Sequence, residues 1–154
     1  MTTLTNYLVP DQVCCDLAAG AKNDVLSELA ELLTKSAGSP DVKTIATALE
    51  DRERLATTGV GDGVAIPHAK LEGIEDNRMA VGISRSGVSF ESVDDQPVHI
   101  FFALVAPLSS AGDHLRILAQ ISRLLKDADV RDRLIKAGSP EELIGIIQSE
   151  SGDQ

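Results

Sequence analysis

The chain has 154 residues, of which 43% are hydrophobic and 25% are charged, and its formal net charge is −10. This length suits one domain with a single core, and the excess of acidic over basic residues, 24 to 14, argues against a protein that binds a nucleic-acid backbone. The sequence contains neither a long uncharged apolar stretch nor the basic and apolar regions of a signal peptide, so we expect a cytosolic protein without membrane insertion.

The acidity fits a basic protein partner, although solubility alone is the simpler explanation. Cys14 and Cys15 are adjacent, so they can build neither a disulfide framework nor a zinc-ligand spacing. We expect two small buried residues in a reducing compartment.

The amino-terminal third predicts a strand followed by a helix. Val13–Leu17 reads as the strand, and Asn23 can cap a helix over Asp24–Ala37 that ends at Gly38. The apolar stripe of this helix is formed by Val25, Leu26, Leu29, Leu32 and Leu33.

A second helix is predicted to begin at Ser39-Pro40, a cap followed by proline, and to run toward Leu55. Its apolar stripe contains Val42, Ile45 and Leu49. The next position on that stripe is Arg52, whose guanidinium needs an anion. Two interpretations stay open: Arg52 pairs with one of the many acids on the surface, or it serves a site in the glycine loop that follows.

Gly59–Gly63 has glycine at every second position and leads through a short apolar strand to Pro67 and His68. Glycines let main-chain N–H groups approach a ligand, so the loop suits an anion. Proline restricts the direction in which His68 leaves the strand. The loop has neither the P-loop nor the dinucleotide register, and the sequence offers no acyl-transfer motif.

The middle of the chain predicts strands at Met79–Ser84 and Val88–Phe90, a turn at Asp94–Pro97 and a central strand over Val98–Ala106. His99 lies inside that last strand, and we assign it no role. A zinc site of the three histidines lacks ligand spacing and is disfavoured.

Three helices are predicted after this strand, opened by Ser110–Asp113, Asp129 and Ser139–Glu142, and a polar tail over Ser149–Gln154. The first runs to about Lys126 and the second to Lys136, and the apolar positions of the third are Leu143, Ile144, Ile146 and Ile147. Alternating helices and strands imply an α/β fold, a three-layer sandwich with a mixed β-sheet and helices on both faces.

His114 shares the buried stripe of the first of these helices with Leu118, Ile121 and Leu125. In the first helical turn, the imidazole and the free N–H groups both favour a phosphate-like group. A core histidine bonded to a backbone carbonyl is the alternative.

Three segments carry the most specific pattern of the chain: Arg52-Glu53-Arg54 with Thr57-Thr58-Gly59-Val60-Gly61, Gly63-Val64-Ala65-Ile66-Pro67-His68, and His114-Leu115-x-x-Leu118. Together they resemble the IIA domain of the fructose/mannitol class of the bacterial phosphotransferase system, above all its nitrogen-regulatory branch. The resemblance extends from about Leu4 to Gln148, and Ala69 departs from it, since family members often carry glycine there.

The resemblance implies that His68 is the phosphorylated histidine, that His114 is the second active-site histidine, and that Arg52 lies beside the phosphoryl group. It implies an HPr-like phosphocarrier protein as donor, without a metal or nucleotide cofactor. Donor docking is expected at Asp41–Leu55 and the rim of the glycine loop.

Three functions stay open: a regulator whose phosphorylated and free forms bind different target proteins, a sugar-specific component that passes phosphate to a IIB domain, and a non-catalytic interaction module. The lack of an attached IIB or membrane domain favours the regulator, and the joint presence of the three site residues disfavours the interaction module.

Overall fold

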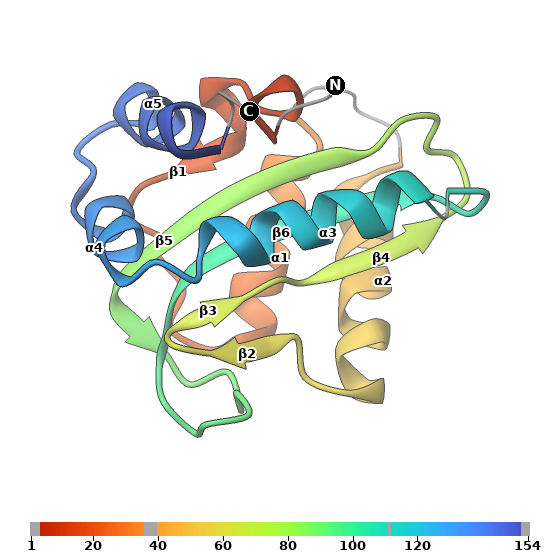
Figure 1. Cartoon of the computed structure of the whole chain (residues 1–154). Coiled ribbons are helices and arrows are strands. Elements are labelled where there is room, and N and C mark those ends of the chain that lie inside the picture. Colours follow the sequence, from red (N-terminus) through yellow and green to blue (C-terminus); the bar gives the residue numbers. More distant parts are fainter. Residues whose placement is uncertain (1–3, 36–39, 111, 152–154) are drawn as a thin grey trace.

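The structure is a computed structural model that describes residues 4–35, 40–110 and 112–151. These residues form one mixed six-stranded sheet with helices on both faces (Figure 1), which confirms the predicted three-layer α/β sandwich. The strands are β1 (Val13–Cys14), β2 (Gly59–Gly61), β3 (Val64–Ala65), β4 (His68–Leu71), β5 (Arg78–Val88) and β6 (Val98–Pro107). The helices are α1 (Lys22–Leu33), α2 (Val42–Leu55), α3 (Gly112–Leu124), α4 (Ala128–Lys136) and α5 (Pro140–Ser151), with short 3-10 turns at Leu4–Tyr7 and Pro10–Gln12.

The sheet is organised around β6. Its order is β1-β5-β6-β3-β2, and β4 also pairs with β6, in parallel, beyond the end of β3. The predicted central strand is therefore confirmed, and its continuous apolar run is explained by burial on both faces. Alternate residues of β6 enter two different cores, since Phe102 contributes to one cluster and Phe101 to the other.

Each core lies between the sheet and its own helices. In Figure 1, α3 crosses one face of the sheet, while α1 and α2 are on the other, more distant face. Leu29 of α1 and Ile45 of α2 belong to one buried cluster, whereas Ile117 of α3 and Leu143 of α5 belong to the other. The amphipathic stripes of these helices thus supply the two apolar layers that hold the sheet.

The starts of the first two helices differ from the prediction. Ala21, not Asn23, is the N-cap of α1, and Ala21 also forms a parallel bridge with Ser89, so a tertiary contact sets this boundary. Asp41 caps α2, because its side chain accepts a hydrogen bond of 2.9 Å from the Thr44 N–H. The predicted cap Ser39 lies outside the described residues. Helix α1 ends at Leu33, with Thr34 as its C-cap, and does not run to Ala37 and Gly38 as predicted.

Of the two caps predicted by capping-box sequences in the later helices, the structure confirms one and contradicts the other. Ser139 accepts from the Glu142 N–H at 3.1 Å, which confirms the cap of α5, but Ser110 Oγ has no hydrogen-bond partner among the described residues, so the capping box predicted there is wrong. Asp127 caps α4 through the Asp129 N–H. Helix α5 continues to Ser151, where we expected a polar tail from Ser149 onward.

Two strand predictions are also corrected. Strand β1 ends at Cys14 instead of Leu17, because the chain then turns toward α1, where the Glu28 carboxylate accepts from the Ala18 and Ala19 N–H groups. Strand β5 is one continuous strand that ends at Val88, so Val88–Phe90 is not a strand of its own. The turn predicted at Asp94–Pro97 is present two residues earlier, over Ser92–Asp95, where the Ser92 carbonyl accepts from the Asp95 N–H at 3.0 Å.

Cys14 and Cys15 carry free thiols and are half-buried, so the expected full burial is not observed. Burial raises the pKa of both thiols. No helix within the described ranges combines the length and the apolar character needed to cross a membrane.

Candidate active site

His68 is the first residue of β4, not the last residue of a strand as the sequence suggested. Strand β3 ends at Ala65, and Pro67 then carries the chain across to β4, where His68 pairs with Leu104 of β6. The Pro67 carbonyl accepts from the Leu104 N–H at 2.9 Å. The backbone on the amino-terminal side of His68 is thereby fixed to the central strand.

Strand alternation decides which way His68 faces. Ala69 and Leu71 are buried in the core beneath α1 and α2, so His68 and Lys70 project to the opposite side, where α3 lies. Ala69, the departure from the family pattern, places its methyl group in that core and has no left-handed φ. The substitution for glycine is therefore accommodated by ordinary strand geometry.

The ring of His68 has one nitrogen committed and one available. Its Nδ1 lies 2.6 Å from the Ile66 carbonyl oxygen. Because a carbonyl can only accept, Nδ1 carries the proton in the neutral ring, and Nε2 carries the lone pair. Burial, and to a smaller extent the charge of Arg52, lowers the pKa of His68 below its usual value of 6.5. The ring is thus neutral at neutral pH and keeps a lone pair on Nε2.

His114 lies beside His68. The two ring centroids are 5.5 Å apart and the planes are tilted by 55°, so two histidines that are 46 residues apart in the sequence meet at the first turn of α3. The His114 residue is only 5% exposed. Burial and the nearby charges of His68 and Lys70 lower its pKa from 6.5 to about 4, so its ring is neutral under ordinary conditions.

One nitrogen of His114 is left without a partner. Its Nδ1 is buried and has no hydrogen-bond partner in the part of the chain that the structure describes. The alternative of a core histidine bonded through this atom to a backbone carbonyl is therefore not observed. A buried lone pair without a partner is tolerated better than a buried N–H, so the tautomer with the proton on Nε2, a hydrogen-bond donor, is favoured.

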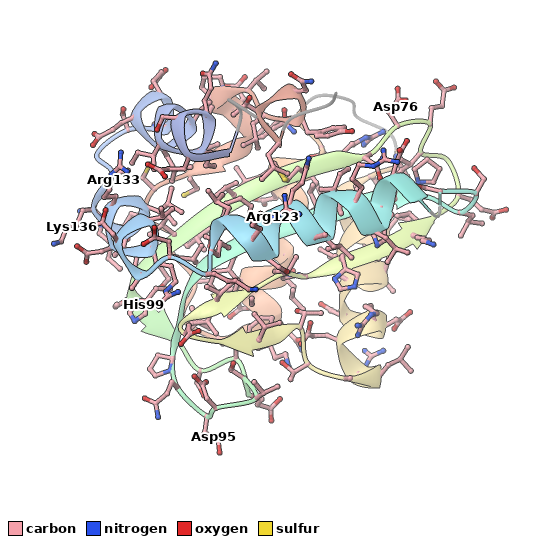
Figure 2. The ribbon with its side chains drawn as sticks, in the orientation of Figure 1. Asp76, Asp95, His99, Arg123, Arg133 and Lys136 are labelled. Carbon is pink, nitrogen blue, oxygen red and sulfur yellow. The ribbon has the colours of Figure 1, made fainter. Side chains whose placement is uncertain are left out.

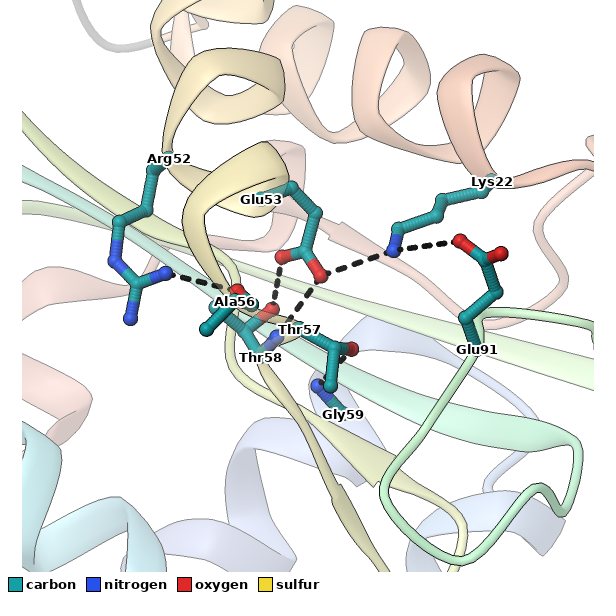
Figure 3. A network of polar contacts seen from close by, with 8 residues as sticks. All are labelled: Lys22, Arg52, Glu53, Ala56, Thr57, Thr58, Gly59 and Glu91. Carbon is teal, nitrogen blue, oxygen red and sulfur yellow. Dashed lines mark hydrogen bonds and ion pairs between the residues drawn. The ribbon is translucent and has the colours of Figure 1, made fainter.

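Arg52 belongs to the last turn of α2 and is half-buried. Its Nη1 donates to the Ala56 carbonyl at 2.9 Å, and its charge is among the causes of the lowered pKa of His68. The sequence placed Arg52 on the core side of α2, but the buried charged residue of this turn is Glu53. Figure 3 shows the two side chains on opposite sides of the end of α2.

Glu53 is the residue of this region whose environment the sequence analysis missed. Its side chain is 3% exposed, and it contacts Lys22 and Thr58. The spacing contained the signal, because Ile45, Leu49 and Glu53 follow one another at intervals of four on the buried face of α2.

The predicted glycine loop is a β-hairpin whose tip lies away from His68. Positive φ angles at Gly61, Asp62 and Gly63 explain the glycines of the turn. At the tip, the Asp62 N–H donates to Asp94 at 3.1 Å, and a Cβ on Gly63 would lie 3.7 Å from the ring of His99. The hairpin tip therefore does not present its amides to His68, as the anion-binding interpretation required.

His99 is separate from the other two histidines. Its Nδ1 lies 2.8 Å from the Ser84 carbonyl, and Figure 2 places it at the α4 end of the sheet. His68 pairs with Leu104, which is five residues further along β6, a separation of about 16 Å along a strand. Within the described ranges, no group of three His, Cys, Asp or Glu residues is arranged to hold a metal ion.

Comparisons with known proteins agree with this fold. The family model described as phosphoenolpyruvate-dependent sugar phosphotransferase system, EIIA 2, matches residues 6–150. A nitrogen regulatory protein of Pseudomonas aeruginosa is 37% identical over 147 residues, which is 96% of each chain. A fructose-specific EIIABC component of Bacillus subtilis is 33% identical over 94% of this chain but 23% of its own length. The crystal structure of nitrogen regulatory protein IIA-Ntr from Neisseria meningitidis superposes with a TM-score of 0.88 at 28% identity, covering 94% of this chain and 98% of that one.

Proposed function

The chain belongs to the phosphotransferase system EIIA 2 family, and from this membership we propose that it is a phosphocarrier that accepts a phosphoryl group on Nε2 of His68. The observation that carries the proposal is the hydrogen bond from Nδ1 to the Ile66 carbonyl. This bond leaves the lone pair of Nε2 free in a neutral ring that lies beside a second neutral imidazole.

The proposed step is a displacement between two histidines. The Nε2 lone pair of His68 forms a bond to phosphorus while the phosphorus–nitrogen bond of the donor histidine breaks, and its electron pair returns to the donor ring. The Nδ1 proton stays on the ring of His68. As the new bond forms, this ring gains positive charge, which the hydrogen bond to the Ile66 carbonyl stabilises. In onward transfer the imidazole of His68 is a good leaving group, so the phosphoryl group can pass to a further acceptor.

Three features would stabilise the charge of the transferring group. Arg52 brings a guanidinium with paired donors to the edge of the site. His114 can donate a hydrogen bond as a neutral ring, and it stands in the first turn of α3, where free N–H groups and the helix dipole favour an anion. Phosphoryl transfer depends mainly on such positioning and electrostatics, so these residues need not form covalent bonds.

We propose an HPr-like phosphocarrier protein as the donor and regulation through target proteins as the outcome. The 37% identity to a nitrogen regulatory protein supports this role. A phosphoryl group adds about two negative charges to a chain whose net charge is already −10. That local change is sufficient to alter the choice of partner electrostatically.

The test is the intact mass of the protein after incubation with phosphoenolpyruvate and the general phosphocarrier proteins of the system, or their nitrogen-branch counterparts, under mildly alkaline conditions. We expect one acid-labile phosphoryl adduct on the wild-type chain and none on His68→Ala. No adduct with either set of carriers would sink the transfer mechanism, and the interaction module would then be the better hypothesis.

The sugar-specific function is supported by the 33% identity to a fructose-specific EIIABC component. It predicts that the phosphorylated chain passes its phosphoryl group to a fructose-type IIB domain. Rapid loss of the adduct upon addition of such a domain would favour this function over regulation.

The carboxyl-terminal end of α2 and the adjoining strand β2 form the proposed donor-docking face. Leu55 is 82% exposed and Val60 is 57% exposed, which is unusual for large apolar side chains and typical of contact surfaces. We expect Leu55→Asp to slow transfer from the protein donor and to leave the reaction with phosphoramidate, a small phosphoryl donor, unchanged. Equal slowing with both donors would contradict docking at Leu55.

A further inference from the structure

We propose that Glu53 is a positioning residue that holds His68 in the tautomer with a free Nε2, acting through Thr58 and Ile66. The inference deepens the proposed phosphocarrier function and rests on it, because that function is what makes the tautomer important. Glu53 does not touch the reacting atoms in this scheme. Its effect travels through three successive hydrogen-bonded contacts.

The first contact joins α2 to the start of the hairpin. One carboxylate oxygen of Glu53 accepts from the Thr58 N–H at 2.9 Å, and the other accepts from the Thr58 hydroxyl (Figure 3). Both residues are buried, with Thr58 3% exposed. A buried carboxylate is costly unless it is fully paired, so this pair strongly favours one position of Thr58.

The second contact joins Thr58 to Ile66. The Thr58 carbonyl accepts from the Ile66 N–H at 3.0 Å and closes the open end of the β2–β3 hairpin. On the other side of Ile66, the Pro67 carbonyl accepts from Leu104 at 2.9 Å. The Ile66 carbonyl is therefore held between two anchored peptide groups, one set by Thr58 and the other by β6.

The third contact is the bond of 2.6 Å between the Ile66 carbonyl and Nδ1 of His68. In free histidine the more stable neutral tautomer carries its proton on Nε2, which would remove the lone pair that the proposed reaction needs. A carbonyl fixed at Nδ1 reverses this preference, because only an N–H can bond to it. The orientation of the Ile66 carbonyl thus decides which nitrogen is nucleophilic.

Lys22 balances the charge of Glu53. Its Nζ lies 3.2 Å from Glu53, 3.4 Å from Glu91 and 4.7 Å from the centre of the Phe90 ring. Glu91 shares Lys22 with Glu53 but is 83% exposed at its side chain, and it lies on a different segment from Thr58. Glu91 therefore offers a matched control that disturbs the same ion-pair network without breaking the contact to Thr58.

The experiment measures the ¹⁵N chemical shifts of both ring nitrogens of His68 in the unphosphorylated chain at about pH 7.5, where the ring is neutral. These shifts report the ratio of the two tautomers. We expect the wild type to be mostly in the Nδ1–H form. In Glu53→Gln, the proportion of the Nε2–H form relative to Nδ1–H should rise about three- to ten-fold, as expected for weakening by about one hydrogen bond. Glu91→Gln should keep the wild-type ratio.

Thr58→Val provides a second variant if Glu53→Gln does not fold. It removes the hydroxyl at nearly constant volume and keeps the backbone N–H, so the ratio should shift in the same direction, while Thr58→Ser restores the wild-type ratio. A wild-type ratio in a folded Glu53→Gln or Thr58→Val variant would overturn the proposal. So would an equal shift in Glu91→Gln.

The experiments distinguish failure of the phosphocarrier function from failure of the positioning role of Glu53. If the wild type accepts no phosphoryl group but the tautomer ratio responds to Glu53→Gln, the phosphocarrier function is wrong and the positioning contact remains. If the wild type is phosphorylated on His68 and the ratio does not respond, Glu53 is a structural residue only.

Discussion

The rings of His68 and His114 lie 5.5 Å apart at an angle of 55°, and a positive charge on His68 contributes to the lowered pKa of His114. Burial acts in the same direction on both pKa values. The pair is therefore neutral near pH 7, with one ring presenting a lone pair and the other able to donate a proton in a hydrogen bond. The pair therefore offers one acceptor nitrogen and one donor nitrogen to a bound group.

His114→Ala should leave a folded protein that still accepts a phosphoryl group, but about 10² to 10³ times more slowly, as found for the removal of one preorganised donor. His68→Ala should accept none. The measurement is the rate of adduct formation by intact mass with the protein donor. His99→Gln serves as the control, because His99 is bonded to Ser84 at the other end of β6, and it should react at the normal rate. A competent His68→Ala together with an inactive His114→Ala would reverse the two roles.

The stability of the fold should decrease as the pH falls below about 6.5. The pKa of His114 is about 4 in the fold and about 6.5 in the unfolded chain, so the unfolded state binds more protons within this window and stability is fully present only above it. Between about pH 7.5 and about pH 5 this histidine should contribute a loss of about 2 kcal/mol. The lowered pKa of His68 acts with the same sign.

Chemical denaturation at both pH values checks this expectation. In His114→Gln, most of the difference in unfolding free energy between the two pH values should disappear, and what remains should come from other groups, His68 among them. An undiminished difference in this variant would mean that His114 is not the buried group that resists protonation.

Arg52→Ala should retain the fold and slow phosphoryl transfer by about 10² to 10³, because it removes a charged donor from the edge of the site. Arg54→Ala is the matched control, since Arg54 is exposed on the same turn and pairs with Asp51. The measurement is the rate of phosphoryl transfer to Arg52→Ala, Arg54→Ala and the wild-type chain under the same conditions. Normal transfer in Arg52→Ala would assign Arg52 to the bond with Ala56 alone.

Two glycines should respond to alanine in opposite ways. A Cβ on Gly82 would lie 2.8 Å from the Leu17 side chain, so Gly82→Ala should destabilise the protein by about 1 to 3 kcal/mol through overpacking. Gly145 lies within α5, and apart from its chain neighbours and the nearby backbone of its own helix, no described atom would lie within 4 Å of its Cβ. Gly145→Ala should therefore stabilise the protein by about 0.8 to 1 kcal/mol. Thermal and denaturant unfolding of both variants would show the difference, and equal effects would contradict the packing around Gly82.

The sequence predicted the elements of this fold better than their ends. Apolar periodicity located α1, α2 and the long strand β6, because each presents a stripe or run that must be buried. Asn23 is not the N-cap of α1, because the bridge between Ala21 and Ser89 sets the start of the helix. Ser110 begins a capping-box sequence, but its Oγ has no hydrogen-bond partner among the described residues. Such boundaries depend on partners from distant segments, which local propensity does not contain.

The sequence by itself determined the residue types of the candidate site, since the pattern around Arg52, His68 and His114 was readable without coordinates. Only the tertiary structure decided how they are arranged in space. The 5.5 Å approach of the two rings and the commitment of Nδ1 to the Ile66 carbonyl depend on how β4 and α3 meet. The buried position of Glu53 at Thr58 depends on the packing of α2 against the hairpin. Hydrogen bonds and burial act over a few ångströms in space, and chain order fixes such distances only within one element.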